Sequence, residues 1–179
     1  MDKYSFLNAA HTGYFAQMYD QYLQQPDSVE PSWRAFFQGF DFGVENSQND
    51  NHTESVTEVP EHLQKEFRVV QLIDAYRKRG HLFTKTNPVR DRRTYQPNLA
   101  LENFGLSQAD RDMVFNAGDI MGIGPNTLTV IIEHLERVYC NSIGVEYMYI
   151  RNPEKLDWIQ KRLHINDNLP NFSQDEKKH

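Results

Sequence analysis

The densest group of side chains capable of chemistry follows a predicted helix, where Arg77, Lys78 and Arg79 precede Gly80 and His81. Neighbouring cations disfavour the protonated form of an imidazole, which makes the setting of His81 unusual. Arg77, Arg79 and His81 are therefore candidates for contact with an anion or with another domain. The alternative is that His81 only fixes the turn after Gly80.

The rest of the chain offers little else for catalysis. The single cysteine, Cys140, ends an apolar helical pattern, which favours a buried structural thiol over a nucleophile. His134 has no second ligand four residues away, so we interpret it as a structural or surface histidine. Gly122-Ile123-Gly124 lacks the third glycine of a nucleotide fingerprint, and no predicted strand precedes it. We therefore predict no catalytic residue and no metal site in this chain.

Composition narrows the class of protein. The 179 residues carry a formal net charge of −6, which argues against a general nucleic-acid binder. No run is long and apolar enough for a membrane span, and the first residues resemble neither a signal nor a transit peptide. We expect a cytoplasmic protein of bacterial type, with no nucleic-acid or membrane partner.

Hydrophobic periodicity predicts a helical body. A broad apolar arc indicates a mostly buried helix from Glu61, ended by Gly80 in a left-handed C′ conformation. Further helices are predicted over 128–139 and from Pro153, which Asn152 can cap; the apolar face of the latter comprises Leu156, Trp158, Ile159 and Leu163. A capping box predicts a short helix from Ser107. Residues 144–150 favour a short strand or an ordered linker.

Two short aromatic helices are predicted before this body. Apolar residues at helical spacing indicate the first (Phe15, Met18, Tyr19, Tyr22 and Leu23), and Pro31 begins the second (Trp33, Phe36, Phe37 and Phe40). Either they pack their aromatic faces on each other or on the body, or they form a partner-binding module. The candidate partner-binding residues are Phe6, Leu7, Tyr14, Tyr19, Trp33, Phe36 and Phe37.

A change of composition separates the two parts. Residues 41–60 are polar and acidic and contain no lysine or arginine, so we expect a disordered linker. The predicted organisation is a helical docking segment over 1–40, the acidic linker over 41–60, and a helical subdomain over 61–163. In 164–179, Ser173 to Glu176 is typical of a helix start, and we expect a region that continues beyond this chain.

Three stretches together resemble the amino-terminal part of the E1 component of 2-oxoglutarate dehydrogenase. They are SFLN (5–8) with Gly13-Tyr14 and PSWRAFF (31–37); AYRKRGHL (75–82) up to Asn87-Pro88; and GVEYMYI (144–150) with WIQKR (158–162). Their order and spacing match over nearly the whole chain. The sequence has Thr86-Asn87-Pro88 where family members commonly have Leu-Asp-Pro, a small departure.

The resemblance implies part of a much longer enzyme. That family decarboxylates 2-oxoglutarate on thiamine diphosphate with magnesium and passes the succinyl group to the lipoyl arm of E2, in the tricarboxylic acid cycle. Its cofactor motif lies outside the matched segment, so we expect this chain to bind no cofactor and to be inactive alone. The implied partners are E2, E3 or both, together with a second E1 in the full-length homodimer.

Two hypotheses remain for this chain. The first is the amino-terminal part of an E1 enzyme, which serves docking and helical support. The second is a stand-alone helical interaction module derived from that family. In either case we predict an all-α fold: short aromatic helices, a disordered acidic linker, and an irregular helical subdomain that begins a larger α/β catalytic body.

Overall fold

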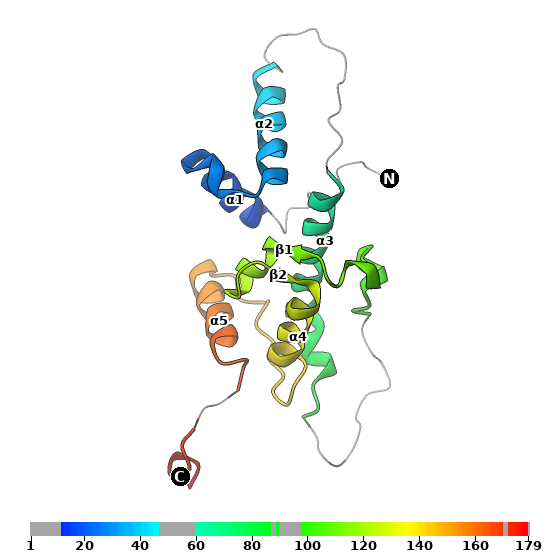
Figure 1. The fold of residues 1–179 in the computed structure, drawn as a ribbon. Helices are drawn as coiled ribbons and strands as arrows, with labels where there is room; N and C mark the ends of the chain where they lie inside the picture. The colour runs from blue at the N-terminus through cyan, green and yellow to red at the C-terminus, as the bar shows by residue number, and fades with distance from the viewer. Residues whose placement is uncertain (1–11, 47–59, 87–88, 90–97, 170–171, 179) are drawn as a thin grey trace. The chain divides into compact units, whose positions relative to one another are not determined.

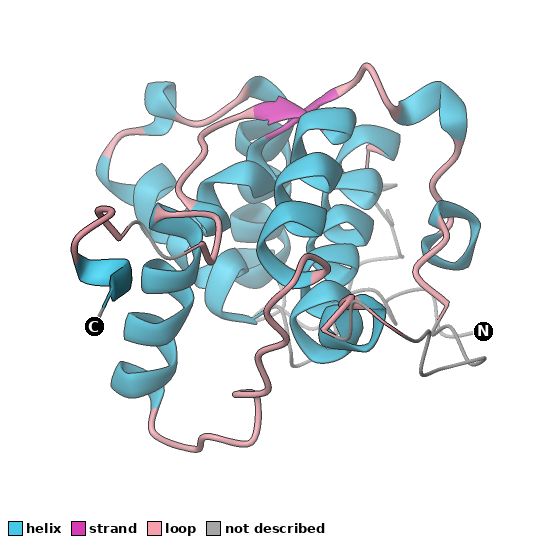
Figure 2. Ribbon diagram, turned by 90° about the horizontal axis from the view of Figure 1, so that it is seen from below, coloured by secondary structure: helices cyan, strands magenta, loops and turns pink. Residues whose placement is uncertain are grey.

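The computed structural model describes residues 12–46, 60–86, 89, 98–169 and 172–178, and these residues are predominantly helical, as predicted (Figures 1 and 2). They form two compact units, Met1–Arg68 and Val69–His179. The α-helices are α1 (Thr12–Gln24), α2 (Pro31–Asn46), α3 (Glu61–Arg79), α4 (Leu128–Tyr139) and α5 (Pro153–Ile165). The 3₁₀ helices cover Pro26–Ser28, Gly80–Phe83, Leu101–Phe104, Gln108–Asp110, Asn116–Met121 and Glu176–Lys178.

The first unit is built on packed aromatic rings. Trp33 and Phe37 of α2 are completely buried and stack with ring centroids 5.3 Å apart. Tyr14 of α1 meets Trp33 edge to face at 5.9 Å, and Phe67, in the part of α3 that belongs to this unit, meets it at 5.4 Å. α1 and α2 therefore pack their aromatic faces on each other, as the first alternative expects.

α2 extends further than predicted. It begins at Pro31 as expected but continues to Asn46, into the segment predicted to be a linker. The hydroxyl of Tyr19 donates to Asp41 Oδ1 at 2.6 Å, which ties the first turn of this extension to α1. Acidic composition alone is therefore a poor guide to the helix end. Residues 47–59 of the predicted linker lie outside the described residues.

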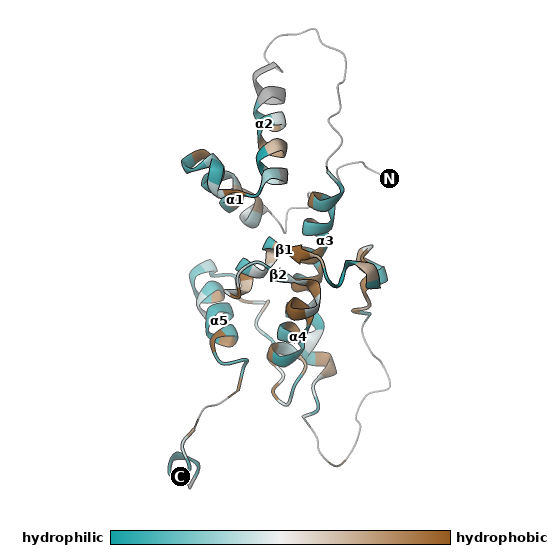
Figure 3. Ribbon diagram, in the orientation of Figure 1, coloured by the Kyte–Doolittle hydropathy of each residue, from teal (hydrophilic) through white to brown (hydrophobic). Residues whose placement is uncertain are grey.

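The second unit has its apolar core around α4 and its part of α3. Figure 3 colours α4 largely hydrophobic, and its buried residues follow the predicted stripe: Leu128, Ile131, Ile132, Leu135, Val138 and Tyr139. Thr127 caps α4, and Asn152 caps α5 by accepting from the backbone of Lys155 at 2.9 Å. The predicted capping box is present too, because Asp110 Oδ2 accepts from both the backbone and the hydroxyl of Ser107.

Two local predictions are wrong, and one pair of alternatives is decided. Residues 144–150 form no strand, so they follow the second alternative, an ordered linker; the small sheet instead pairs β1 (Val114–Phe115) with β2 (Asn126–Thr127), antiparallel. Gly80 is not left-handed, because α3 passes directly into the 3₁₀ helix Gly80–Phe83. Trp158, assigned to the apolar face of α5, is 66% exposed. Each of these predictions used local pattern alone.

Candidate functional site

Two regions hold the residues singled out from the sequence. The aromatic cluster of α1 and α2 lies in the first unit, and the basic end of α3 lies in the second. Phe6 and Leu7 lie outside the described residues.

The candidate partner-binding residues divide by exposure. Tyr14, Trp33 and Phe37 are buried, whereas Tyr19 and Phe36 are half-buried. Buried rings can support a binding surface but cannot supply its contact area. The accessible apolar surface of this region instead belongs to the half-buried rings and to more exposed residues that the prediction did not include, such as Phe40 at 44% exposure.

The basic end of α3 does not form one converged site. The Arg77 side chain is buried; its Nη2 donates to the carbonyl oxygen of Ile120 at 3.4 Å, and its Nη1 lies 3.6 Å from Asp74. His81 Nε2 instead lies 2.8 Å from Glu146, and the carbonyl oxygen of His81 accepts from the Thr84 hydroxyl at 2.6 Å. These contacts place His81 in the turn that follows α3.

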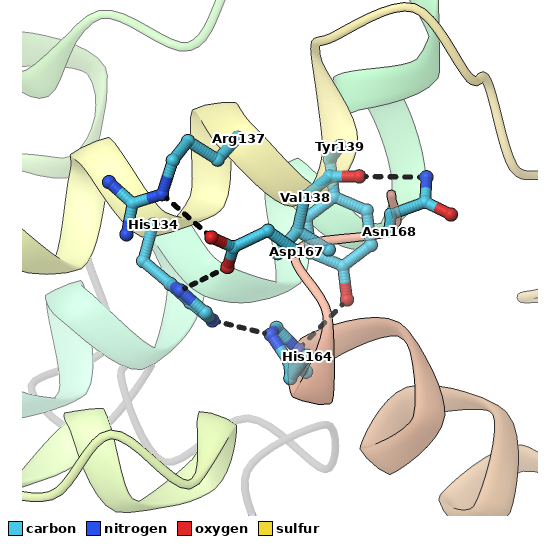
Figure 4. A network of polar contacts seen from close by, with 7 residues as sticks. All are labelled: His134, Arg137, Val138, Tyr139, His164, Asp167 and Asn168. Atoms are coloured by element: carbon cyan, nitrogen blue, oxygen red, sulfur yellow. Dashed lines mark hydrogen bonds and ion pairs between the residues drawn. The ribbon is translucent and has the colours of Figure 1, made fainter. Parts of the chain in front are cut away.

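Sequence reasoning missed a buried polar network that joins α4, α5 and the loop between them (Figure 4). His134 Nε2 and His164 Nδ1 are 2.9 Å apart, and His164 Nε2 lies 3.1 Å from the Tyr139 hydroxyl. That hydroxyl lies 3.0 Å from the hydroxyl of Tyr147. At the other end, His134 Nδ1 lies 3.2 Å from Asp167 Oδ1. His134 and His164 are thirty positions apart, so no short spacing signals the pair.

Asp167 determines the direction of the hydrogen bonds in this network. An ionised carboxylate only accepts, so His134 Nδ1 carries a proton and donates to it. His134 Nε2 then accepts from His164 Nδ1, and His164 Nε2 accepts from Tyr139. This order holds when both histidines are neutral, and each is then protonated on Nδ1. The carboxylate fixes the first donor, and the neutrality of the two rings fixes the donors that follow.

Burial keeps both histidines neutral. It lowers the pKa of His134, and it lowers the pKa of His164 to about 3, with Arg77 and His134 contributing in the same direction. Burial likewise raises the pKa of Tyr139 and of Tyr147. The network therefore holds no net charge on its rings near neutral pH. It is suited to joining helices and is not poised for proton transfer.

A tight turn after α5 brings Asp167 to α4. Asp167 and Asn168 have φ of 49° and 55°, a left-handed conformation that Asp and Asn tolerate better than most residues. Asn168 Nδ2 donates to the carbonyl oxygens of Val138 and Ile143, at 3.0 and 3.2 Å. Arg137 Nε donates to Asp167 Oδ2 at 3.1 Å. The turn thus fixes the end of α5 against the end of α4.

A cleft of about 840 Å³ opens near Cys140, with Tyr76, Phe83, Glu133 and Glu136 among its lining residues. Burial and the nearby Glu136 raise the pKa of the Cys140 thiol to about 12. Burial also raises the pKa of Tyr76. Both groups stay protonated at neutral pH, so neither is an activated nucleophile. Cys140 is half-buried at this cleft, however, and not buried as the sequence pattern suggested.

Two further properties hold for the described residues. No three or more of their His, Cys, Asp and Glu side chains form a group that could hold a metal ion. None of their helices combines the length and apolar character needed to cross a membrane.

Comparison with known proteins confirms the resemblance seen in the sequence. A family model described as the 2-oxoglutarate dehydrogenase N-terminus matches residues 4–44. The chain is 29% identical to the 2-oxoglutarate dehydrogenase E1 component of Azotobacter vinelandii and 30% identical to that of Cupriavidus necator, over 97% and 98% of its length. It is 29% identical, over 90% of its length, to the mitochondrial 2-oxoglutarate dehydrogenase of Saccharomyces cerevisiae.

The match is to one region of longer proteins. The chain spans about a fifth of each relative: 21% of both bacterial proteins and 19% of the yeast protein. The matched region is the amino-terminal one.

Proposed function

We propose that this chain is the amino-terminal part of a 2-oxoglutarate dehydrogenase E1 component. Such an enzyme decarboxylates 2-oxoglutarate oxidatively and transfers the succinyl group to lipoyl-E2. The observation that supports this proposal is similarity over nearly the whole chain to enzymes of that name. A cytoplasmic location and a homodimeric full-length enzyme belong to the same proposal.

Within that enzyme we assign docking to the first unit. The family model covers residues 4–44, which include α1 and nearly all of α2, and that part of the chain carries half-buried and exposed aromatic rings. Buried Trp33 and Phe37 hold the two helices together, so that Phe40 and its neighbours can contact E2 or E3. The second unit, with its polar network, provides helical support at the start of a larger α/β catalytic body.

We place thiamine diphosphate and magnesium outside this chain. Magnesium requires oxygen ligands, usually one or two carboxylates together with the phosphates of the cofactor. The described residues contain no group of three or more His, Cys, Asp and Glu side chains that could hold a metal ion. We propose that the chain alone is inactive and binds neither thiamine diphosphate nor magnesium.

Binding of the whole chain to purified E2 and E3 from the same organism tests the docking role. We expect measurable capture by at least one of them in surface plasmon resonance. The variant Leu23→Ser with Phe40→Ser removes two exposed apolar side chains of the first unit, of 58% and 44% exposure, and should weaken binding at least tenfold.

The matched control is Trp158→Ser, which removes a ring of 66% exposure from the second unit and should leave capture unchanged. Far-UV circular dichroism verifies that every variant is folded. Failure of the wild-type chain to bind either component would overturn the docking role. An equal loss of binding in both variants would show that the binding surface is not specific to α1 and α2.

The alternative is a stand-alone interaction module derived from the same family. The coding sequence distinguishes the two. An in-frame continuation with a thiamine motif beyond His179 supports the E1 proposal, whereas a stop codon directly after His179 supports the module.

A further inference from the structure

One surface of the first unit combines open aromatic rings with carboxylates. It comprises Phe15, Tyr19, Phe36, Phe40 and Asp41, which we call the acidic aromatic face. Phe15 lies at the centre of three of the rings, with centroids 5.9 Å from Phe36, 6.0 Å from Phe40 and 6.5 Å from Tyr19. Phe40 is 44% exposed, and the other three rings are half-buried. Ring surface is therefore accessible on both α1 and α2.

Asp41 brings a carboxylate to the edge of these rings. Its Oδ1 accepts a hydrogen bond of 2.6 Å from the hydroxyl of Tyr19. This bond raises the pKa of Tyr19, so the phenol remains a protonated donor. A carboxylate has several further acceptor positions, and this one hydrogen bond leaves its negative charge in place.

The surrounding charge is not balanced. Residues 13–41 contain four carboxylates and one guanidinium, that of Arg34. Arg34 is already engaged: its Nη1 lies 3.0 Å from Asp27, and its Nε donates to the carbonyl oxygen of Pro26 at 2.9 Å. Within the part of the chain that the structure describes, no Lys, Arg or His side chain pairs with Asp41 or with Asp20 of α1. Among the described residues, the carboxylate of Asp41 thus lies beside open rings without a cationic side chain paired to it.

We propose that the acidic aromatic face receives an arginine side chain of the partner that docks on the first unit. An aromatic face attracts a cation through its quadrupole, and a carboxylate can accept two hydrogen bonds from a guanidinium. Arginine suits the combination better than lysine, because its planar group stacks on rings and is more weakly hydrated. The negative charge disfavours nucleic acid and anionic lipid. The inference rests on the docking role proposed above and names the chemistry of that contact.

Asp41→Asn is the sharpest test. Asparagine Oδ1 can still accept from Tyr19, so the variant removes the charge and keeps the hydrogen bond. We expect its affinity for E2 or E3, whichever captures the wild type, to fall about tenfold at low salt, and the salt dependence of binding to become shallower. The matched control is Asp157→Asn on α5, which has the same change in net charge and whose carboxylate pairs with Lys161. It should bind as the wild type does.

The outcomes separate the two proposals. Capture of the wild type with unchanged affinity and salt dependence in Asp41→Asn overturns the arginine contact and leaves the docking role standing. Absence of capture of the wild type overturns the docking role itself.

A small-molecule probe tests the arginine contact without E2 or E3. N-acetyl-arginine amide, titrated into the isotope-labelled chain, should shift NMR signals of Phe15, Phe40 and Asp41. N-acetyl-citrulline amide, its uncharged analogue, should not. Equal shifts with both probes, or shifts with neither, count against the proposal.

Discussion

Gly80 lies so close to Tyr139 that a Cβ added to the glycine would be 2.6 Å from the Cβ of the tyrosine. Real Cβ atoms do not approach so closely, and the tyrosine Cβ is fixed to its helix. The glycine therefore marks the place where the end of α3 passes against the end of α4. Glycine is required at this position because it has no side chain, and not because it can adopt a left-handed conformation.

Gly80→Ala should destabilise the chain by about 1–3 kcal/mol, because the helices must separate or distort to admit a methyl group. Urea unfolding followed by far-UV circular dichroism measures the loss. Gly13→Ala is the matched control: among the described residues, no atom outside the backbone of its own helix turn lies within 4 Å of a Cβ built there, and alanine is the better helix former in α1. A Gly80→Ala variant as stable as Gly13→Ala would contradict the close approach.

His164 should make the second unit sensitive to acid. Its pKa is about 3 when folded, against 6.5 in the unfolded chain, so the unfolded state binds the proton more readily between these values. The stabilisation from neutral His164 is complete above pH 6.5 and declines as the pH falls toward 3, by at most about 1.4 kcal/mol per pH unit. Burial also lowers the pKa of His134, which contributes to the decline in the same direction.

The variant His164→Asn isolates this contribution. At pH 7.5 it should be less stable than the wild type by about 1–3 kcal/mol, because buried partners lose hydrogen bonds. The deficit should shrink as the pH is lowered through 6 and 5. Chemical unfolding at each pH provides the comparison. Parallel plots of stability against pH for the two proteins would contradict the prediction, because they would show that His164 binds a proton as readily in the folded state as in the unfolded state.

The direction of the hydrogen bonds can be observed directly. At pH 7, long-range ¹H–¹⁵N spectra should show His134 and His164 neutral and protonated on Nδ1, because Asp167 accepts from His134. Asp167→Asn retains a residue that tolerates the left-handed turn but removes the charge, so the preference of His134 for this tautomer should weaken. An Nε2-protonated His134 in the wild type would refute the derived order.

Phe37 and Phe40 should differ sharply in their effect on stability. Phe37→Ala empties a fully buried site and should cost about 3–5 kcal/mol, enough to unfold the first unit. Phe40→Ala removes a ring that is 44% exposed and should cost about 1 kcal/mol or less. When Trp158→Phe is present in every variant, Trp33 is the only tryptophan. Its fluorescence emission should then shift to longer wavelength in Phe37→Ala and not in Phe40→Ala.

Rules of local sequence sufficed for the helices and their caps. Asn152 followed by Pro153 marks the start of α5, and Ser107 with Asp110 marks a capping box, because each motif satisfies backbone groups within four residues. The apolar stripe of α4 is also local, since one helix face repeats every three to four residues. These predictions needed no knowledge of the neighbouring elements.

The polar network could not be predicted in this way. His134 and His164 become partners only because a turn returns α5 to α4, and no short sequence spacing links the two residues. The contact between Gly80 and Tyr139 could not be predicted for the same reason, because these residues are also remote in sequence. The burial of the aromatic residues could not be predicted either: their spacing located the cluster but could not distinguish buried Trp33 from exposed Phe40.

The setting of Cys140 makes it a natural site for measuring the rate of chemical labelling. Alkylation requires an accessible, ionised thiol, and the raised pKa of Cys140 makes that state rare while the surroundings are folded. Cys140 is half-buried and lines the cleft, and the sequence has no other cysteine, so the labelling rate of the unmodified chain reports the access to this one thiol and its ionisation. The effect of a partner or a substitution on the surroundings of Cys140 can thus be measured at one natural atom, without introducing a probe.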